Sequence, residues 1–429
     1  MSGPGGMVVR PASSQVLVVL ALTNLVSYAA RNALFTVYPD LAARYRIDDS
    51  ELGFLQTVFM VPHAAATLGF GWAGDRFDRR WVIAAGMLLA SVAGAAGALG
   101  DRYLGLAASR ALVGLGTAAV VPVANSILSQ LYDGPAKASR LAIFNLGLFL
   151  GGVIGFGAGM ALGFPVVVVA LAVPGAVLSV AVLMLPVPSQ ELARSAASGA
   201  HHVSLLAMAR TFAADARVLL RIPTLRWVIA STAVMAFAAG GYAAWLKEFL
   251  VRDKGMSEPA ASALLGMAMF GGLAGVLAGG RVADLLARRA PAGRMWTIVL
   301  GMTATAPCAA IAIETGPGLP LDAAGVLTLF FISWYHAPMA ATVDDLAPPG
   351  LAVAAQSLVI FAMHMIGTAP SSWVVGVISE HATLYAAMWV PTGAVVVAAL
   401  CMAIATRTFA RDRAAARGRQ RGAPGGRSL

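Results

Sequence analysis

Long apolar runs alternate with short polar stretches along the whole chain. A helix needs about 20 apolar residues to cross ~30 Å of hydrocarbon, and each run has about that length or more. Lipid admits only backbone whose hydrogen bonds are closed internally, so each run is predicted to be a transmembrane helix. Twelve such spans are expected near residues 15–39, 51–73, 81–100, 104–132, 140–163, 165–186, 224–250, 258–283, 293–314, 321–345, 351–378 and 382–406.

Composition supports this interpretation, because 59% of the residues are hydrophobic and only 12% are charged. Soluble proteins carry about 25% charged residues, and a water-soluble core cannot absorb so much apolar surface. The net charge of +10 is unevenly spread, since Lys and Arg collect in alternate loops and in the C-terminal tail. The positive-inside rule therefore predicts a multi-pass protein of the cell's inner (plasma) membrane with both termini cytoplasmic.

The longest connection divides the spans into two sets of six. We expect an N-terminal six-helix bundle over residues 1–186, a cytoplasmic linker over 187–223, a C-terminal six-helix bundle over 224–407 and a basic cytoplasmic tail over 408–429. Apolar and Arg residues alternate in the second part of the linker, which predicts an amphipathic helix on the membrane surface. The tail is rich in Arg, Gly and Ala, so it is predicted to be disordered and drawn to anionic lipid.

A polar motif lies between the second and third spans: Gly71-Trp72-Ala73-Gly74-Asp75-Arg76-Phe77-Asp78-Arg79-Arg80. Its Gly, Asp and Arg pair recur between spans eight and nine as Gly280, Asp284, Arg288 and Arg289. Matched spacing over such a distance indicates an internal duplication. The plainer alternative is a generic positive-inside loop, which the repeat makes improbable.

The motif resembles the signature loop of the major facilitator superfamily. The resemblance implies an all-α membrane protein of two pseudo-symmetric six-helix bundles, in which this loop latches the halves in the outward-open state. It carries a gating role onto Asp75, Arg76 and Arg80, and onto Asp284 in the repeat. Gly71 would allow close helix approach, and Arg79 would anchor the loop to lipid phosphates.

A narrower resemblance, to the spinster branch, rests on several further segments. They are Asn24-Leu25-Val26-Ser27-Tyr28-Ala29-Ala30-Arg31, Ser50-Glu51-Leu52-Gly53, Arg110-Ala111-Leu112-Val113-Gly114-Leu115-Gly116, Pro122-Val123-Ala124-Asn125-Ser126, Ile143-Phe144-Asn145-Leu146-Gly147 and Asp344-Asp345-Leu346-Ala347-Pro348. Spinster-like proteins move lysolipids and sphingoid phosphates, and their bacterial relatives are linked to protons. In that branch, acids commonly occupy the positions that Ala30 and Thr117 hold here.

Two arginines lie inside spans and could share a depth in the outer half: Arg31 and Arg110. A charged side chain in hydrocarbon is expensive, so each should face a cavity or a partner. With both acids replaced, we expect the guanidinium groups to bind an anionic substrate. The alternative is that they bond backbone carbonyls, Tyr28 or Asn125 and only hold helices together. Asn24, Thr117 and Trp334 complete the candidate substrate-binding set.

The loss of the acids leaves three intramembrane histidines, His63, His336 and His364, as candidates for proton coupling. Imidazole titrates in the physiological range, although a lone histidine inside a span is as often a helix–helix hydrogen bonder.

No Walker loop, nucleophile elbow or metal-ligand spacing is present, so the sequence predicts no enzyme, no cofactor and no metal. The function expected is secondary active transport by alternating access, with an amphipathic or organic anion, such as a lysolipid, as substrate. The alternatives are an exporter of a neutral or cationic lipophile, and a transport-inactive sensor or accessory protein. A monomer is expected, with a small-molecule or lipid substrate, membrane lipids around it and no nucleic acid.

Overall fold

A computed structural model describes residues 11–132, 134–187, 205–348 and 351–422 of the chain. Within these ranges it leaves undescribed the side chains of residues 11–13, 71, 72, 74–76, 134–139, 142, 205, 206, 208, 337 and 417–422. The described residues form helices and no strands. Twelve helical segments among them are long and apolar enough to cross a membrane, which confirms the predicted fold class.

Contacts divide the chain into two compact units, residues 1–40 with 65–203 and residues 41–64 with 204–429. The first holds α1 (Pro11–Thr36), α4 (Arg79–Leu99), α5 (Tyr103–Thr117), α6 (Val120–Leu131), α7 (Gly134–Leu162) and α8 (Val166–Leu183). The second holds α10 (Leu205–Leu219), α11 (Pro223–Arg252), α12 (Glu258–Arg289), α13 (Gly293–Glu314), α14 (Leu319–Ile332), η1 (Ser333–Tyr335), α15 (His336–Leu346), α16 (Ala352–Ala362), η2 (Met363–Thr368), α17 (Ala369–His381) and α18 (Leu384–Gly422).

Two helices belong to both units, α2 (Tyr38–Tyr45) and α3 (Asp49–Arg76). The first part of α3, up to residue 64, packs within the second unit, and its remainder packs within the first. The boundaries at residues 186, 223 and 407 were predicted from the order of the spans along the chain. This division of the chain into domains stays a prediction. In the linker, α10 is helical, and its Phe212 ring meets the Phe361 ring of α16 at 5.9 Å.

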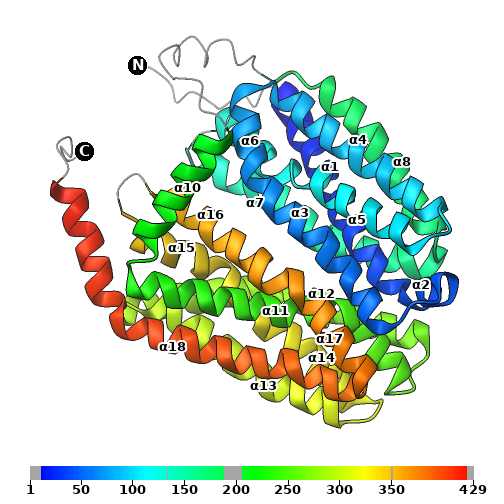
Figure 1. The fold of residues 1–429 in the computed structure, drawn as a ribbon. Helices are drawn as coiled ribbons and strands as arrows, with labels where there is room; N and C mark the ends of the chain where they lie inside the picture. Colours follow the sequence, from blue (N-terminus) through cyan, green and yellow to red (C-terminus); the bar gives the residue numbers. More distant parts are fainter. Residues whose placement is uncertain (1–10, 133, 188–204, 349–350, 423–429) are drawn as a thin grey trace, which may run out of the picture. The chain divides into compact units, whose positions relative to one another are not determined.

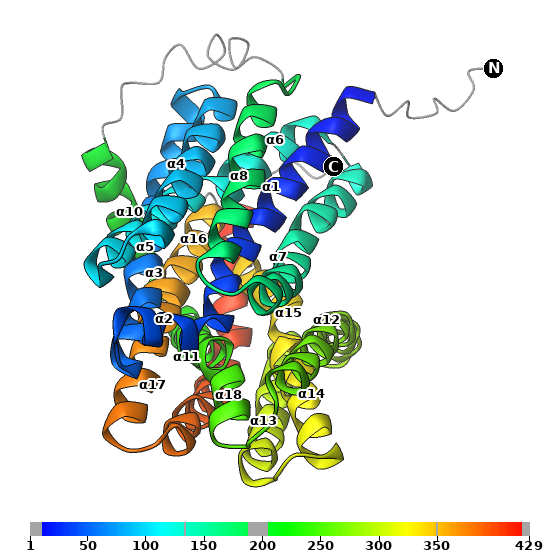
Figure 2. The same cartoon turned by 90° about the vertical axis from the view of Figure 1, so that its right-hand side faces the viewer.

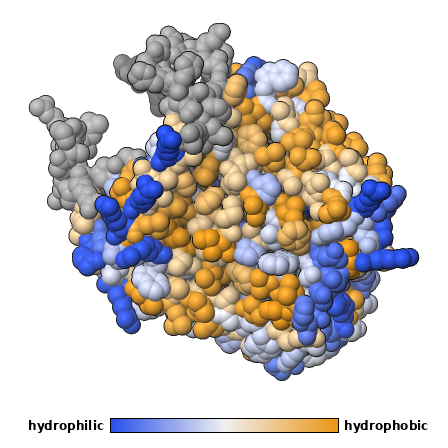
Figure 3. Space-filling view, viewed as in Figure 1, coloured by the Kyte–Doolittle hydropathy of each residue, from blue (hydrophilic) through white to orange (hydrophobic). Residues whose placement is uncertain are grey.

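Large apolar side chains are exposed on many helices, among them Trp81 and Val92 of α4 and Val173 and Val177 of α8. Figure 3 shows apolar residues over most of the visible helix surface, with hydrophilic residues gathered near helix ends. In water such a surface would be unfavourable, whereas lipid tails solvate it. The exposed faces therefore fit contact with hydrocarbon.

In the first unit, α7 lies directly on the backbone of α1 through a row of glycines. A Cβ atom on Gly151 would overlap the carbonyl of Leu25, and one on Gly155 would overlap the carbonyl of Ala29. Small residues at a four-residue period bring two membrane helices this close. The contact fixes the helix that carries Arg31.

In the second unit, α12, α13 and α14 lie side by side (Figure 2), and α18 packs along both α11 and α13. The buried hydroxyl of Ser231 on α11 donates to the carbonyl of Ala398 on α18 at 2.8 Å. Threonine hydroxyls are mostly bonded back into their own helix, as Thr232 is to Val228 at 2.7 Å. In hydrocarbon this local bond satisfies a hydroxyl without a partner helix.

Span four is interrupted between α5 and α6, at residues 118–119, and span ten is interrupted by a turn of 3₁₀ helix, η1. A proline lies four residues beyond a residue of each break, Pro122 after Ala118 and Pro338 after Trp334. Proline has no N–H, so the carbonyl four residues earlier loses its helical hydrogen bond. The two halves of the sequence thus carry a broken helix at the same place in their order, which the hydropathy pattern does not predict.

The prediction of a disordered tail is wrong for residues 408–422, because α18 continues through them (Figure 1). The Asp412 carboxylate accepts hydrogen bonds from the backbone N–H and the hydroxyl of Thr224, at 3.0 and 2.8 Å. Arg413 is paired with Asp345 at 3.1 Å. A carboxylate is favourable at a helix N-terminus, so Asp412 caps α11 while it holds the end of α18 in place.

The α1–α7 contact predicts a position-specific response to one added methyl group. Gly155→Ala should lower the apparent Tm, because its Cβ meets the Ala29 backbone and overpacking costs about 1–3 kcal/mol. Thermal unfolding in detergent measures the change. Gly157→Ala on the same helix is the control, since nothing lies within 4 Å of the Cβ position there. Equal Tm values for the two variants would contradict the contact.

Candidate substrate and gating sites

The first unit contains a cavity of about 40 Å³ beside Arg110. Ala30 of α1 and Thr117 of α5 both line it, together with Ser27 and Ser91. The structure therefore brings into one place the arginine and the two positions at which the spinster branch commonly has acids. A volume of this size admits water but no lipid headgroup.

The two predicted arginines lie near each other in the first unit. Arg110 is 5% exposed, and Arg31 and Tyr38 are close enough to act on its charge. Tyr28 is likewise close enough to Arg31 to act on its charge. Two buried guanidinium groups repel each other, and their desolvation is compensated only by anions or well-placed acceptors. Neither Ala30 nor Thr117 supplies a carboxylate, and the Thr117 hydroxyl donates into its own helix, to Val113, at 2.9 Å.

The other candidate substrate residues do not share that cavity. Asn24 on α1 is buried and donates to the carbonyl of Phe144 on α7 at 2.9 Å, so it holds two helices together. Asn125 lies on α6, and its Oδ1 is buried with no hydrogen-bond partner among the described residues. Trp334 belongs to the second unit, within the broken span ten, where its ring packs against Phe330 and Phe331.

Two of the three histidines come together in the second unit. The His63 and His364 rings meet edge to face at 5.9 Å, and His63 also stacks on Phe59 at 5.5 Å. His364 lies in η2, a π-helical segment that interrupts span eleven. Single π-helical turns inside α-helices often accompany functional sites. His336 lies apart from this pair at the start of α15, with its Nδ1 3.1 Å from the carbonyl of Ser333.

In the motif loop the side chains of residues 71, 72 and 74–76 are not described, so the predicted roles of Gly71, Asp75 and Arg76 lie outside the described residues. Arg79 is buried and donates to Gln130 of α6 at 2.5 Å, so this guanidinium holds helices together within the protein. Arg80 bonds Asp78, the N-cap of α4, and the carbonyl of Leu185 at 3.2 Å. These contacts therefore do not favour the predicted anchoring of Arg79 to lipid phosphate.

Asp284, the counterpart in the repeat, is exposed on α12. In the second unit the Asp345 carboxylate joins helices, because it pairs with Arg294 of α13 and with Arg413 of α18, each at 3.1 Å. Asp345 belongs to the Asp-Asp-Leu-Ala-Pro segment of the spinster resemblance. This segment therefore ties the ends of three helices within one unit.

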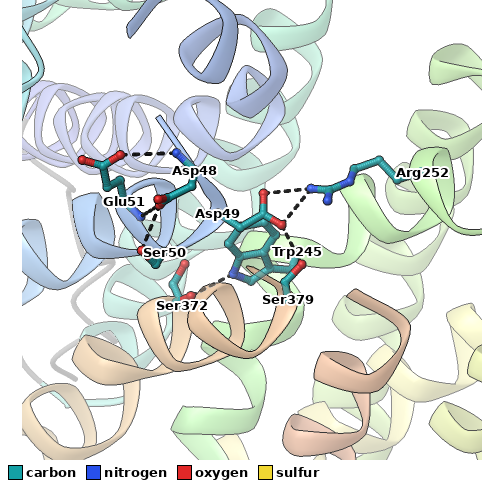
Figure 4. Close-up of polar contacts among 8 residues, drawn as sticks. All are labelled: Asp48, Asp49, Ser50, Glu51, Trp245, Arg252, Ser372 and Ser379. Atoms are coloured by element: carbon teal, nitrogen blue, oxygen red, sulfur yellow. Dashed lines mark hydrogen bonds and ion pairs between the residues drawn. The ribbon is translucent and has the colours of Figure 1, made fainter. Parts of the chain in front are cut away.

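At the opposite end of the second unit, the start of α3 is built by a capping box. The Asp48 carboxylate accepts from the backbone N–H of Glu51 at 2.9 Å, and Glu51 accepts from the N–H of Asp48 at 3.3 Å (Figure 4). This reciprocal pairing satisfies N–H groups that a helix start leaves open. Two residues on, a Cβ at Gly53 would overlap the backbone of Ser372 in α17, so only glycine permits this approach.

Three residues beside this capping box form what we call the Asp49 cluster: Asp49, Arg252 and Ser379. Figure 4 shows the Asp49 carboxylate between the other two, bonded to the Arg252 guanidinium at 2.9 and 3.0 Å and to the Ser379 hydroxyl at 2.6 Å. Nearby, the indole N–H of the fully buried Trp245 donates to the Ser372 carbonyl at 2.9 Å. The cluster thus joins the starts or ends of α3, α11 and α17.

Comparison with known proteins decides the family. The model of the Major Facilitator Superfamily matches residues 20–372. The chain belongs to the major facilitator superfamily. This is a superfamily of transporters, so the chain is a transporter and not an enzyme.

Its relatives include spinster proteins. It is 25% identical over 391 residues to protein spinster homolog 3 of Danio rerio, with 86% of this chain and 77% of the relative covered. It is 26% identical over 394 residues to protein spinster homolog 1 of Homo sapiens, with 86% and 73% covered. The predicted resemblance to the spinster branch is confirmed as a resemblance.

Solved structures agree on the fold. A bacterial homologue of the human lysosomal transporter Spinster, crystallised in an inward-facing and unoccupied conformation, has a TM-score of 0.77 and 19% identity, with 94% of this chain and 99% of that chain covered. A D-xylose–proton symporter has a TM-score of 0.71 and 13% identity, with 91% and 97% covered. Both are transporters of the fold predicted from the sequence.

The contacts of Asp345 predict which of two acids, Asp345 or Asp284, stabilises the second unit of the transporter. Asp345→Asn should lower the apparent Tm, because two ion pairs of about 0.2–1 kcal/mol each are lost. Asp284→Asn should leave it unchanged, since Asp284 is exposed. Thermal unfolding in low and high salt measures both, and a larger effect at Asp284 would contradict the assignment.

Proposed function

We propose that this chain is a secondary active transporter that works by alternating access and moves an amphipathic or organic anion. Membership of the superfamily supports transport, and the break in each of spans four and ten supports a role for that span in substrate binding. In transporters, helices broken at corresponding positions of the two repeats commonly form the substrate site, because their freed backbone groups face a cavity. Thr117 and Trp334, both candidate substrate residues, lie at these two breaks.

The proposal of an anionic substrate rests on one observation. A single cavity brings Arg110 together with Ala30 and Thr117, and Arg31 lies near Arg110. Where an acid stood at either position, it would neutralise an arginine from within the protein. With Ala and Thr there, a substrate phosphate or carboxylate can supply that charge in a conformation in which the site is wider than this cavity of about 40 Å³. The planar guanidinium fork binds such groups with two hydrogen bonds. A lysolipid is one amphiphile that carries both the anionic group and an apolar tail.

The distribution of Lys and Arg supports a place in the cell's inner (plasma) membrane with both termini cytoplasmic. In that topology the Asp49 cluster lies at the outer side and Asp345 at the inner side. Each joins helix ends within the second unit. The transporter is proposed to act as a monomer.

Arg110→Gln should weaken binding of a lysophosphatidate by about 10–100-fold, because a hydrogen bond to a charged group is worth about 1.5–3 kcal/mol. The monoacylglycerol with the same acyl chain lacks the phosphate, so its affinity should not change. Binding in detergent and flux into proteoliposomes measure the effect, and Arg102→Gln at an exposed position is the control. Unchanged lysophosphatidate affinity in folded Arg110→Gln would overturn the anionic assignment and favour a neutral or cationic lipophile.

Thr117→Glu and Thr117→Gln form a matched pair of nearly equal size for the same question. The glutamate would place a carboxylate beside Arg110 and compete with the substrate anion, whereas the glutamine would not. Lysophosphatidate binding should therefore fall more in Thr117→Glu. If lysophosphatidate binds but is not transported into vesicles with a pH gradient of either direction, the result would instead favour the transport-inactive sensor.

Contact between His63 and His364 supports these two histidines as the coupling candidates. If they carry protons, transport by wild type should depend on pH between about 5 and 8, because imidazole changes charge there. The variant His63→Gln/His364→Gln should lose that dependence, and His336→Gln should keep it. A flat wild-type profile would remove all three histidines from coupling.

A further inference from the structure

One face of α11 carries three residues near the Asp49 cluster: Trp245, Glu248 and Arg252. Their spacing of three and four residues places them on the same side of the helix, one turn after another. Trp245 bonds α17, and Arg252 bonds the start of α3. Glu248 therefore lies between two residues that connect α11 to its neighbours.

Glu248 lies near the end of its span, yet its side chain is only 4% exposed. Its Oε1 atom is buried and has no hydrogen-bond partner among the residues that the structure describes. Neighbouring Lys247 is equally buried but is paired with Glu258 of α12 at 3.2 Å. A buried carboxylate needs either a cation with good geometry or a proton.

The charged groups that act on Glu248 come from three helices. Lys247 and Arg252 belong to α11 itself, Glu258 to α12 and Asp49 to α3. From α17, Ser379 contributes a neutral hydroxyl to the cluster. Of the two cations, Lys247 is held by Glu258 and Arg252 by Asp49. Ionised Glu248 thus shares Arg252 with Asp49, and the two acids compete for one guanidinium.

We propose that Glu248 is a proton-binding residue of this transporter and that its proton decides whether Arg252 stays bonded to Asp49. With the proton on Glu248, Arg252 pairs with Asp49 and holds the start of α3 against α11 and α17. Loss of the proton to water leaves a carboxylate one helical turn from Arg252, and the guanidinium moves to it by a change of rotamer. Asp49 then keeps only the Ser379 hydroxyl. The role in transport rests on the proposed alternating access.

Water reaches this site from one side, because the Arg252 side chain is 45% exposed and that of Glu258 is 57% exposed. A proton can therefore enter or leave along the exposed charges while Glu248 itself stays buried. The Glu248 site is distinct from the histidine pair, because His63 lies farther along α3 and His364 lies in η2.

Two measurements on the full chain in lipid nanodiscs test the proposal without any substrate. Nitroxide labels at Ser50→Cys and Ala382→Cys, with Cys308→Ala and Cys401→Ala, report the separation of α3 from the end of α17 by EPR. Infrared spectra report the protonated carboxylic acid. In wild type, raising the pH should add a population with longer label distances and remove a carboxylic acid band.

Glu248→Gln mimics the protonated side chain, so the longer-distance population and the titrating band should both be lost. Glu380→Gln removes an exposed acid of α17 that is not among the groups acting on Glu248, and it should keep both. Asp49→Asn removes the competing acid and should leave the longer-distance population at every pH. Glu248→Asp keeps a carboxylate and should retain the pH response.

The proposal is overturned if the label distances and the acid band do not change between pH 4 and 9 in the chain that keeps Glu248, a result that needs no substitution at the proposed site. It is also overturned if Glu248→Gln keeps the pH response while His63→Gln/His364→Gln loses it, which would assign the response to the histidines. Because no substrate is present, failure of anion binding at Arg110 leaves this outcome unaffected, and the converse also holds.

Discussion

Hydrocarbon offers no hydrogen bond to a polar group, and this constraint shapes each part of the transporter. Backbone groups are closed within helices, and threonine hydroxyls such as Thr232 turn back to their own carbonyls. Close packing of α7 on α1 through glycines gives these helices contact area that lipid alone would not favour. Charged groups away from helix ends are tolerated only where protein, water or substrate can satisfy them, as around Arg110.

The spans could be predicted because their signal is local: a run of about 20 apolar residues has few other uses. The breaks in spans four and ten could not, because proline alone does not produce them. Pro62, Pro174, Pro307 and Pro391 all lie inside continuous helices. The breaks near Pro122 and Pro338 therefore depend on more than the proline in the local sequence. The helical tail was missed for the same reason, since Asp412 caps a helix far away in the sequence.

The candidate site likewise has features that the sequence could predict and features that it could not. Depth along a span could be counted from the sequence, so Arg31 and Arg110 were expected at a similar depth, whereas the cavity that collects Arg110, Ala30 and Thr117 required coordinates. Side-chain contacts depend on how each helix is rotated about its axis. The meeting of His63 with His364, and of Asp49 with Arg252 and Ser379, therefore required coordinates. Glu248 falls near the end of the predicted span 224–250, and its burial reflects the helices that cover that end.

One helix, α3, joins the Asp49 cluster to the signature loop. α3 begins at Asp49, among contacts of the second unit, and ends at Arg76, in the signature loop of the first. A helix transmits displacement along its axis because its backbone bonds hold each turn to the next. The proposed release of Asp49 from Arg252 would therefore act on the same helix that carries Asp75 and Arg76. A single continuous helix thus links the proposed proton site to the signature loop.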